Sequence, residues 1–415
     1  MLTRRRLILG ATAAAAAGTG LAVGLTDEHG RSLPYIPLDP PKPGLPGRQH
    51  AWEATLHRDR YGNPVPPRHD RLLFFDVVGT AVPEHARILE AALRTLERTY
   101  RWGPGGLLFT AGWGPGYFER VLGQSSPIPR AKALSDFELP EIDDYDLCLH
   151  IASDDEQRLA DVQSSLVHAV VLPEAHGPLA LSSALRWRET RTGFAGTGLP
   201  AAHQHVGGIP PGNPVAADAP LFMGFKSSLR RNQASEDDVT IAAGAFTGGT
   251  TMAVSYMRLR LDSWYEDLTE RERVARMYAP QLTPAQASRL TTDAAGDPGK
   301  LEQAIERFGV IGHAQTSARA RRHGKPLINR RDFNTVDGGQ AGLHFISIQR
   351  TIEDFVTTRT AMNAASAQLQ NPAITDTVNN GINEFIFVLR RANYILPTRA
   401  QRSFPLLPDR EHALD

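Results

Sequence analysis

Apolar and polar positions alternate along this chain in blocks that predict strands and helices in turn. The apolar run RLLFFDVVG predicts a strand, and PEHARILEAALRTLERTYRW then carries apolar residues at helical spacing, with Pro83 near its start. A second strand is predicted over LLFTAGWG, a third over DYDLCLHIAS and a fourth over SALRWRETRTGF. Between the third and fourth, DDEQRLADVQSSLVHAV predicts a helix with an acidic first turn.

A second block of the same kind follows residue 220. TTMAVSYMRLRLDSWYE predicts a strand that runs into a helix, and we expect this helix to continue through LTERERVARMY. GLHFISIQR predicts another strand, and TIEDFVTTRTAMNAA predicts another helix. Because strand–helix–strand units occur twice, the sequence predicts an α+β protein of two halves, each an antiparallel sheet with helices on one face.

The two ends of the chain differ from this body. Residues 1–26 begin MLTRRRLILG and continue as a weakly hydrophobic run rich in Ala and Gly, which is typical of a twin-arginine export signal. Residues 27–70 are so rich in proline that we expect an extended linker. The body then divides into an N-terminal half at 71–220 and a C-terminal half at 221–400, followed by a tail at 401–415.

The alternative interpretation of residues 1–26 is an ordinary secretory signal or a single membrane anchor. The run is only weakly hydrophobic, which suits the twin-arginine route better than a stable membrane span. That route exports proteins that are already folded, often with their cofactor inserted. We therefore expect the twin-arginine translocase as a partner and a periplasmic, extracellular or membrane-surface location.

Charge and cysteine content narrow the classes of function. The chain has 45 Lys and Arg against 45 Asp and Glu, so no global field favours nucleic acid as a partner. The single cysteine, Cys148, excludes an intrachain disulfide and a cysteine-rich metal cluster. An exported protein without disulfides must be held together by its core or by a cofactor. The sequence leaves the oligomeric state open, a homo-oligomer included.

The clearest candidate chemistry lies between residues 310 and 355. His313 follows an apolar step and precedes the pair Arg330-Arg331, a Gly-rich turn and the strand GLHFISIQR. A neutral imidazole is a good axial ligand for haem iron, and an arginine can stabilise negative charge that develops on a peroxide. A lone histidine is by itself more often structural than a ligand.

This layout resembles the C-terminal half of the dye-decolorising (DyP-type) peroxidases, in which a proximal histidine precedes I-x-R-R and G-L-x-F-x-x-x-Q-R-x-I follows. FTAGWGPGYFERVLG, PRAKALSDFELPEIDDYDLCLHIASDDEQ and GTTMAVSYMRLRLDSWYEDLTERERVARM are similar to further segments of that family, in the family's order across residues 71–360. The resemblance implies two ferredoxin-like halves in a dimeric α+β barrel-like fold. It also implies haem b with its iron, peroxide as oxidant, and a small-molecule or dye-like electron donor.

The resemblance further implies roles for individual residues. His313 would be the axial ligand of the haem iron. Arg330 would lie on the distal side of the haem as a catalytic residue, with Arg331 as the fallback if the alignment slips by one position. Gly224 and Phe225 open the stretch that corresponds to the family's G-x-x-D-G signature, and they would border the cofactor.

This stretch departs from the family's signature at its most important position. Ser227 stands in the place of the aspartate that helps to move the peroxide proton. A serine hydroxyl has no useful basicity near pH 7, so this catalytic role is vacant unless Arg330, a water or another residue fills it. Low peroxidase activity is the expected consequence.

A second departure concerns the proximal side. Haem-ligating histidines usually donate their other N–H to a carboxylate or a carbonyl, but no acidic residue lies between His313 and Arg331. The basic run from Arg319 to Lys325 could pair with haem propionates or form an exposed loop. Two functions stay open: an exported DyP-type haem peroxidase, or a non-peroxidase protein of the same fold that binds haem or serves without cofactor as an interaction protein.

Overall fold

The computed structural model describes residues 36–226, 232–287 and 298–407. Ser227 and the twin-arginine segment lie outside these ranges. The elements of the N-terminal half are β1 (His69–Val77), α1 (Pro83–Thr99), β2 (Leu108–Trp113), β3 (Glu141–Ile142), β4 (Leu147–Ser153), α2 (Glu156–His168), β5 (Leu185–Phe194) and α3 (Leu199–Ala202). Those of the C-terminal half are β6 (Thr250–Leu259), α4 (Leu261–Glu266), α5 (Glu270–Met277), α6 (Pro284–Ala287), α7 (Pro298–Gln303), α8 (His313–Ser317), β7 (Arg321–Arg322), β8 (Lys325–Pro326), β9 (Ile328–Arg330), β10 (Phe333–Thr335), β11 (Gly342–Gln349), α9 (Ile352–Asn363), α10 (Ala365–Gln370) and β12 (Ile386–Leu396).

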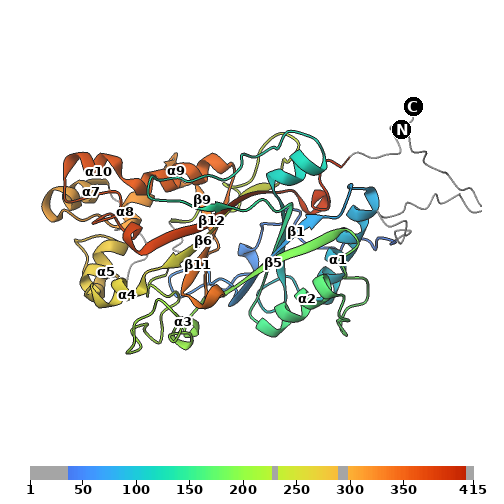
Figure 1. Ribbon diagram of the computed structural model, residues 1–415, viewed down its shortest axis with the longest axis horizontal. Helices are drawn as coiled ribbons and strands as arrows, with labels where there is room; N and C mark the ends of the chain where they lie inside the picture. Colours follow the sequence, from blue (N-terminus) through green and yellow to red (C-terminus); the bar gives the residue numbers. More distant parts are fainter. Residues whose placement is uncertain (1–35, 227–231, 288–297, 408–415) are drawn as a thin grey trace, which may run out of the picture. The chain divides into compact units, whose positions relative to one another are not determined.

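The strands form two four-stranded antiparallel sheets of the same design. Their orders are β5-β1-β4-β2 and β12-β6-β11-β10, so the two halves are both ferredoxin-like. Pairing of β2 with β12 and of β5 with β10 closes the eight strands into a barrel. Helices α1 and α2 lie beside the first sheet, and α9 lies beside the second, with α8 next to α9 and α5 next to α8 (Figure 1). The predicted α+β barrel of two ferredoxin-like halves is confirmed.

Both faces of the sheet are covered, which explains the nearly continuous apolar strands. In β1, Leu73 and Phe75 pack in the core that includes α1 and α2. The alternate residues Leu72 and Phe74 point the other way and pack with Cys148 and with residues of the second sheet, inside the barrel. A strand buried on both faces loses the apolar–polar alternation that marks a half-exposed strand.

Two expectations about the C-terminal half are corrected. The helix expected to run on from β6 is two helices, because α4 ends at Glu266 and α5 begins at Glu270. Thr269 caps the second helix: its hydroxyl accepts from the Glu272 N–H, and the Glu272 carboxylate accepts from the Thr269 N–H. In addition, β9, β10 and β12 complete the sheet, although the periodicity predicted only two strands in this half.

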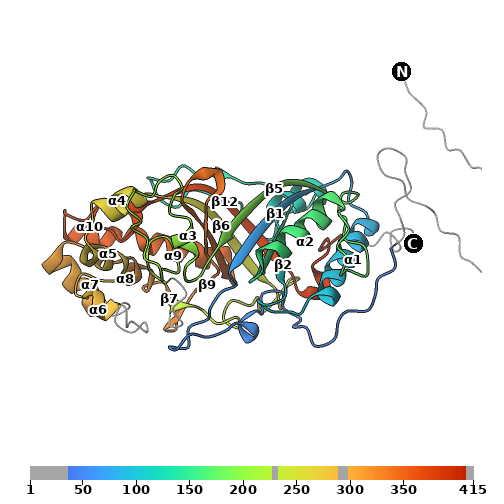
Figure 2. The same cartoon turned by 90° about the horizontal axis from the view of Figure 1, so that it is seen from below.

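The proline-rich segment has little regular structure, but part of it packs firmly against the barrel. Gln49, His50 and Trp52 are buried. The Gln49 amide bonds both backbone groups of Ala111 in β2, and Figure 2 shows the segment running along the underside of the strands. Within the described ranges, no helix is long and apolar enough to span a membrane.

Candidate functional site

A large cavity lies in the C-terminal half, between the outer face of its sheet and helices α5, α8 and α9. All the residues that line it fall between Leu221 and Arg391, and its volume is about 1190 Å³, part of it open to solvent. Ligand pockets in proteins usually measure roughly 300–1,000 Å³. The cavity is therefore large enough for a sizeable ligand, and most of the side chains on its wall are apolar.

Strand alternation decides which side chains reach this cavity. Strands β9 and β10 share one register against β11, with Arg330 opposite Ser347 and Phe333 opposite His344, so they behave as one interrupted strand. Successive side chains of a strand point to opposite faces. Accordingly Arg330, Asp332 and Asn334 line the cavity, whereas Phe333 packs inside the barrel.

His313 reaches the same cavity from the first residue of α8. Two glycines allow the backbone to approach it closely. A Cβ at Gly312 would overlap the Tyr278 carbonyl, and a Cβ at Gly381, where φ is +57°, would lie 3.0 Å from the His313 Cα. The Gln315 side chain accepts a hydrogen bond from the Gly312 N–H at 2.9 Å. The start of α8 is thus fixed by its backbone surroundings.

The His313 imidazole is neutral at ordinary pH. Burial, together with the positive charges of Arg330 and Arg359, lowers the pKa of His313 to about 3. Neither group is acidic, so among the described residues no carboxylate acts on this imidazole. The form present is the unprotonated one that can bind a metal.

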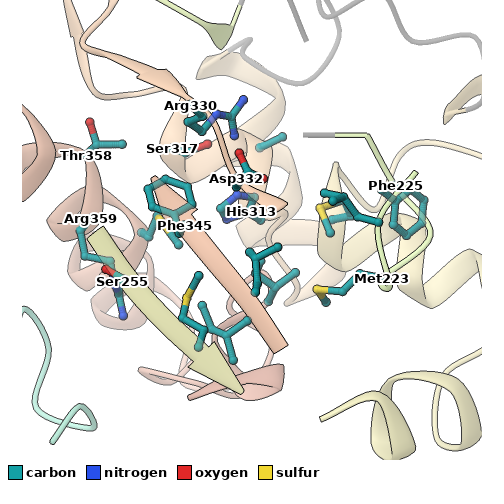
Figure 3. A pocket seen from close by; sticks show the side chains of 18 of the residues that line it. Met223, Phe225, Ser255, His313, Ser317, Arg330, Asp332, Phe345, Thr358 and Arg359 are labelled. Atoms are coloured by element: carbon teal, nitrogen blue, oxygen red, sulfur yellow. The ribbon is translucent and has the colours of Figure 1, made fainter. Parts of the chain in front are cut away.

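Arg330 and Asp332 form a charged patch on the wall of the cavity (Figure 3). Burial lowers the pKa of Arg330, while the nearby Asp332 and Tyr278 act in the other direction. The Gln233 side-chain oxygen accepts from the Arg330 backbone N–H at 2.8 Å, which fixes the strand at this point. A fixed cation at this position can stabilise negative charge on a ligand in the cavity.

Arg359 of α9 and Arg391 of β12 supply further positive charge to the wall, and they share one carboxylate. Glu138 lies in the N-terminal half, yet it pairs with Arg359 at 2.7 Å and with Arg391 at 2.8 Å. Burial raises the pKa of Glu138, but the two guanidinium groups outweigh it and hold the pKa below its usual value. Two cations against one anion leave this part of the wall positive.

The remaining predicted residues are spread around the cavity. Phe225 lines it, while the exposed Gly224, with φ of +86°, forms the turn just before Phe225. Arg331 does not line it: its guanidinium lies 3.9 Å from the centre of the Trp52 ring and bonds the His50 carbonyl. Ser227 lies outside the described residues.

The basic run after α8 faces away from the cavity. Arg322 pairs with Asp354, Lys325 pairs with Asp238, and Arg319 bonds the Ser366 hydroxyl. None of the residues from Arg319 to Lys325 lines the cavity. The Lys and Arg side chains that line it are those of Lys226, Arg330, Arg359 and Arg391.

Sequence reasoning missed three charged residues of the wall: Asp332, Arg359 and Arg391. Asp332 could have been predicted from the sequence, because it follows Arg330 by two positions and a strand places both side chains on one face. Arg391 lies in an apolar segment, IFVLRRANYIL, whose register shifts between Val388 and Arg390. No local pattern indicates that such an arginine is buried.

Comparisons with known proteins agree with this architecture. The family of unknown function DUF7405 matches residues 67–398, and the chain belongs to that family. No curated protein matches the chain. The DyP-type peroxidase from Cellulomonas bogoriensis superposes with a TM-score of 0.55 at 20% identity, over 82% of this chain and 94% of that one.

Two further solved structures extend the likeness. A variant of Rhodococcus jostii RHA1 DypB in complex with heme gives a TM-score of 0.54 at 14% identity, over 86% of this chain and 98% of that one. A dye-decolorizing peroxidase from Bacteroides thetaiotaomicron gives a TM-score of 0.51 at 13% identity, over 85% of this chain and 99% of that one. At these identities the likeness establishes the DyP-type fold over most of the chain, and the fold alone does not fix the activity.

Proposed function

We propose that this protein is an exported haem-binding peroxidase of DyP type that reduces peroxide and oxidises a small electron donor. One observation carries the proposal: in this fold, His313 and Arg330 line a single large cavity. The imidazole is neutral and the guanidinium is held by a strand. These are the two groups that a haem peroxidase needs on its protein walls.

The residues of the cavity fit haem b. An apolar wall suits the porphyrin ring, and the neutral His313 suits its iron. Arg359 and Arg391, which share one carboxylate, suit the propionates, and the buried Arg391 Nε has no hydrogen-bond partner among the described residues. Haem supplies, when bound, the redox chemistry that splits the O–O bond and accepts electrons from a donor.

The protein's own groups then have distinct tasks. His313 holds the cofactor through its unprotonated nitrogen. Arg330 orients the peroxide and stabilises the negative charge on the departing oxygen, because its charge is fixed in a buried site where such interactions are strong. The apolar wall of Met257, Phe345 and Val388 limits access of water.

Export by the twin-arginine translocase belongs to the same proposal. The route carries folded proteins, so haem could enter the cavity before translocation. The support is the segment MLTRRRLILG and the Ala-rich run that follows it.

A second candidate is a haem-binding protein without peroxidase activity. It is favoured by the surroundings of His313, where the acting charges are both positive. A histidine ligand without a carboxylate partner is less basic and gives a less electron-rich iron. The peroxide reaction rate of the haem-loaded protein distinguishes the two candidates.

The test is the absorption spectrum of protein produced with haem available. Wild type is expected to show a Soret band, and His313→Ala is expected to lose or shift it. His205→Ala is the matched control, because His205 is exposed and lies outside the cavity. A wild-type protein without haem would overturn the proposal in favour of a cofactor-free interaction protein. If the spectrum of His313→Ala were identical to that of wild type, another residue would be the ligand of the haem iron.

A further inference from the structure

We propose that Asp332 is the proton-transfer group of this cavity and fills the role that Ser227 leaves vacant. The inference rests on the proposed peroxidase function. It assigns to a named carboxylate the task of moving the peroxide proton beside Arg330.

Placement comes from the interrupted strand β9–β10. Asp332 is two residues after Arg330 in one continuous register, so both side chains point to the cavity face. In the view of Figure 3, the Asp332 carboxylate lies between Arg330 and His313. It also lines a smaller cavity beneath the proline-rich segment, bordered by Pro64, Pro66 and Asp70. Asp332 therefore stands at the wall between two cavities.

The lack of partners sets this carboxylate apart. Asp332 is 7% exposed, yet among the described residues none donates a hydrogen bond to it and none forms an ion pair with it within 4 Å. Other buried carboxylates are bound: Glu138 by two arginines, Glu97 by Arg399 and Arg402, and Asp70 by His150. A buried charge is costly unless it is paired or functional.

The neighbours leave Asp332 available to a ligand. Asp332 acts electrostatically on Arg330, but the charges that act on His313 are those of Arg330 and Arg359. Asp332 is thus not the hydrogen-bond acceptor of the histidine. Asp332 lines the same cavity as Arg330, whose guanidinium would bind peroxide.

In the proton-transfer step, the Asp332 carboxylate accepts and then donates one proton, so its protonation state is the same before and after. The carboxylate takes a proton from one oxygen of hydrogen peroxide and gives it to the other, whose bond to the first then breaks. Both electrons of the O–O bond leave with the departing oxygen, which carries two protons away as water. Haem, when bound, would supply the two electrons that the remaining oxygen atom lacks. Two one-electron donors would then replace these electrons, and with two protons the remaining oxygen would leave as a second water. This requires a group that both accepts and donates a proton, as a carboxylate does.

The experiment uses haem-loaded full-length protein and the variants Asp332→Asn, Asp332→Glu and Asp237→Asn. Asp237 is the control because its side chain is 83% exposed and lies outside the cavity. The Soret band and haem content are measured first and are expected to match wild type in all three. The rate of the Soret change after mixing with hydrogen peroxide should fall about 10²–10⁴-fold in Asp332→Asn, and Asp332→Glu should recover part of it.

A second readout does not depend on turnover. Hydrogen cyanide must lose its proton when it binds ferric haem, so its association rate should fall in Asp332→Asn and the pH profile of that rate should change. Unchanged peroxide and cyanide kinetics in Asp332→Asn, with haem bound, would overturn the inference alone. The inference would also be overturned if Ser227→Asp raised the rate of reaction with hydrogen peroxide while Asp332→Asn left that rate unaltered. A wild-type protein that binds no haem would overturn this inference together with the proposed function.

Discussion

Arg330 and Arg331 are consecutive residues, yet their side chains lie in different surroundings. Arg330 lines the cavity beside Asp332, whereas the Arg331 guanidinium stacks on Trp52 and lies 3.5 Å from Glu236. Strand alternation separates them. The two residues look like one basic motif in the sequence, but Arg330 faces the cavity and Arg331 joins the proline-rich segment to the barrel.

This separation predicts that substitution of Arg330 slows the reaction with peroxide, whereas substitution of Arg331 lowers the stability of the fold. Arg330→Leu should slow the reaction of the haem-loaded protein with peroxide by about 10²–10³-fold, since a fixed charge at the reacting oxygens is lost. Arg331→Leu should instead lower the free energy of unfolding by about 1–3 kcal/mol, because Glu236 and the His50 carbonyl lose their donor. Stopped-flow spectroscopy and urea unfolding measure the two. The reverse pattern would show that Arg331 is the distal residue.

Replacement of Glu138 should lower the free energy of unfolding, because this residue of the N-terminal half pairs with two arginines of the C-terminal half. Glu138→Gln leaves Arg359 and Arg391 without their shared carboxylate, and the side chain of Glu138 is 1% exposed. Breaking such a buried pair should cost about 3–5 kcal/mol. Glu141→Gln is the control: its partner is Arg390 and its side chain is 67% exposed, so its loss should cost about 0–1 kcal/mol. Equal effects in urea unfolding would contradict this account.

Acid should destabilise the protein through its buried histidines. Burial lowers the pKa of His50 to about 3, with Arg331 and Arg48 adding to the shift, and His313 shows the same value. Above pH of about 6.5 both imidazoles are neutral in the folded and unfolded states, and no stability is lost. Between about 6.5 and 3 only the unfolded state binds the protons, so stability falls by up to about 1.4 kcal/mol per pH unit for each group.

The measurement is the urea midpoint of the haem-free protein at pH 7, 6 and 5. His50→Gln and His313→Gln should each flatten the decline, whatever they do to stability at pH 7. His205→Ala is again the control, since this exposed residue should leave the slope unchanged. A wild-type midpoint that does not decline across this window would rule out neutral buried imidazoles at these positions.

Export through the twin-arginine route predicts a simple genetic outcome. Replacing Arg4 and Arg5 with lysine should trap the protein in the cytoplasm, because that route requires the arginine pair. Arg31→Lys, outside the twin-arginine pattern, should leave export intact. Fractionation followed by immunoblotting provides the measurement. Normal export of the double-lysine variant would contradict the proposal.

The sequence by itself determined the order of elements and the class of fold. The periodicities of β1, α1, β4, α2, β11 and α9 are local properties, so a single segment is enough to indicate each element. The position of Thr269 shows the limit of this reasoning: apolar spacing suggested one helix, but a capping box begins a new one there. The candidate pair His313 and Arg330 was likewise visible from spacing and resemblance.

Only the tertiary structure decided how the charges are used. Glu138 meets Arg391 from 253 positions away, and Glu236 meets Arg331 from 95 positions away. A charged residue that is buried against a distant partner looks the same in the sequence as one that is exposed to solvent. Asp332 illustrates the point: its position beside Arg330 follows from strand alternation, but its burial without a partner follows from how one sheet and three helices enclose the cavity.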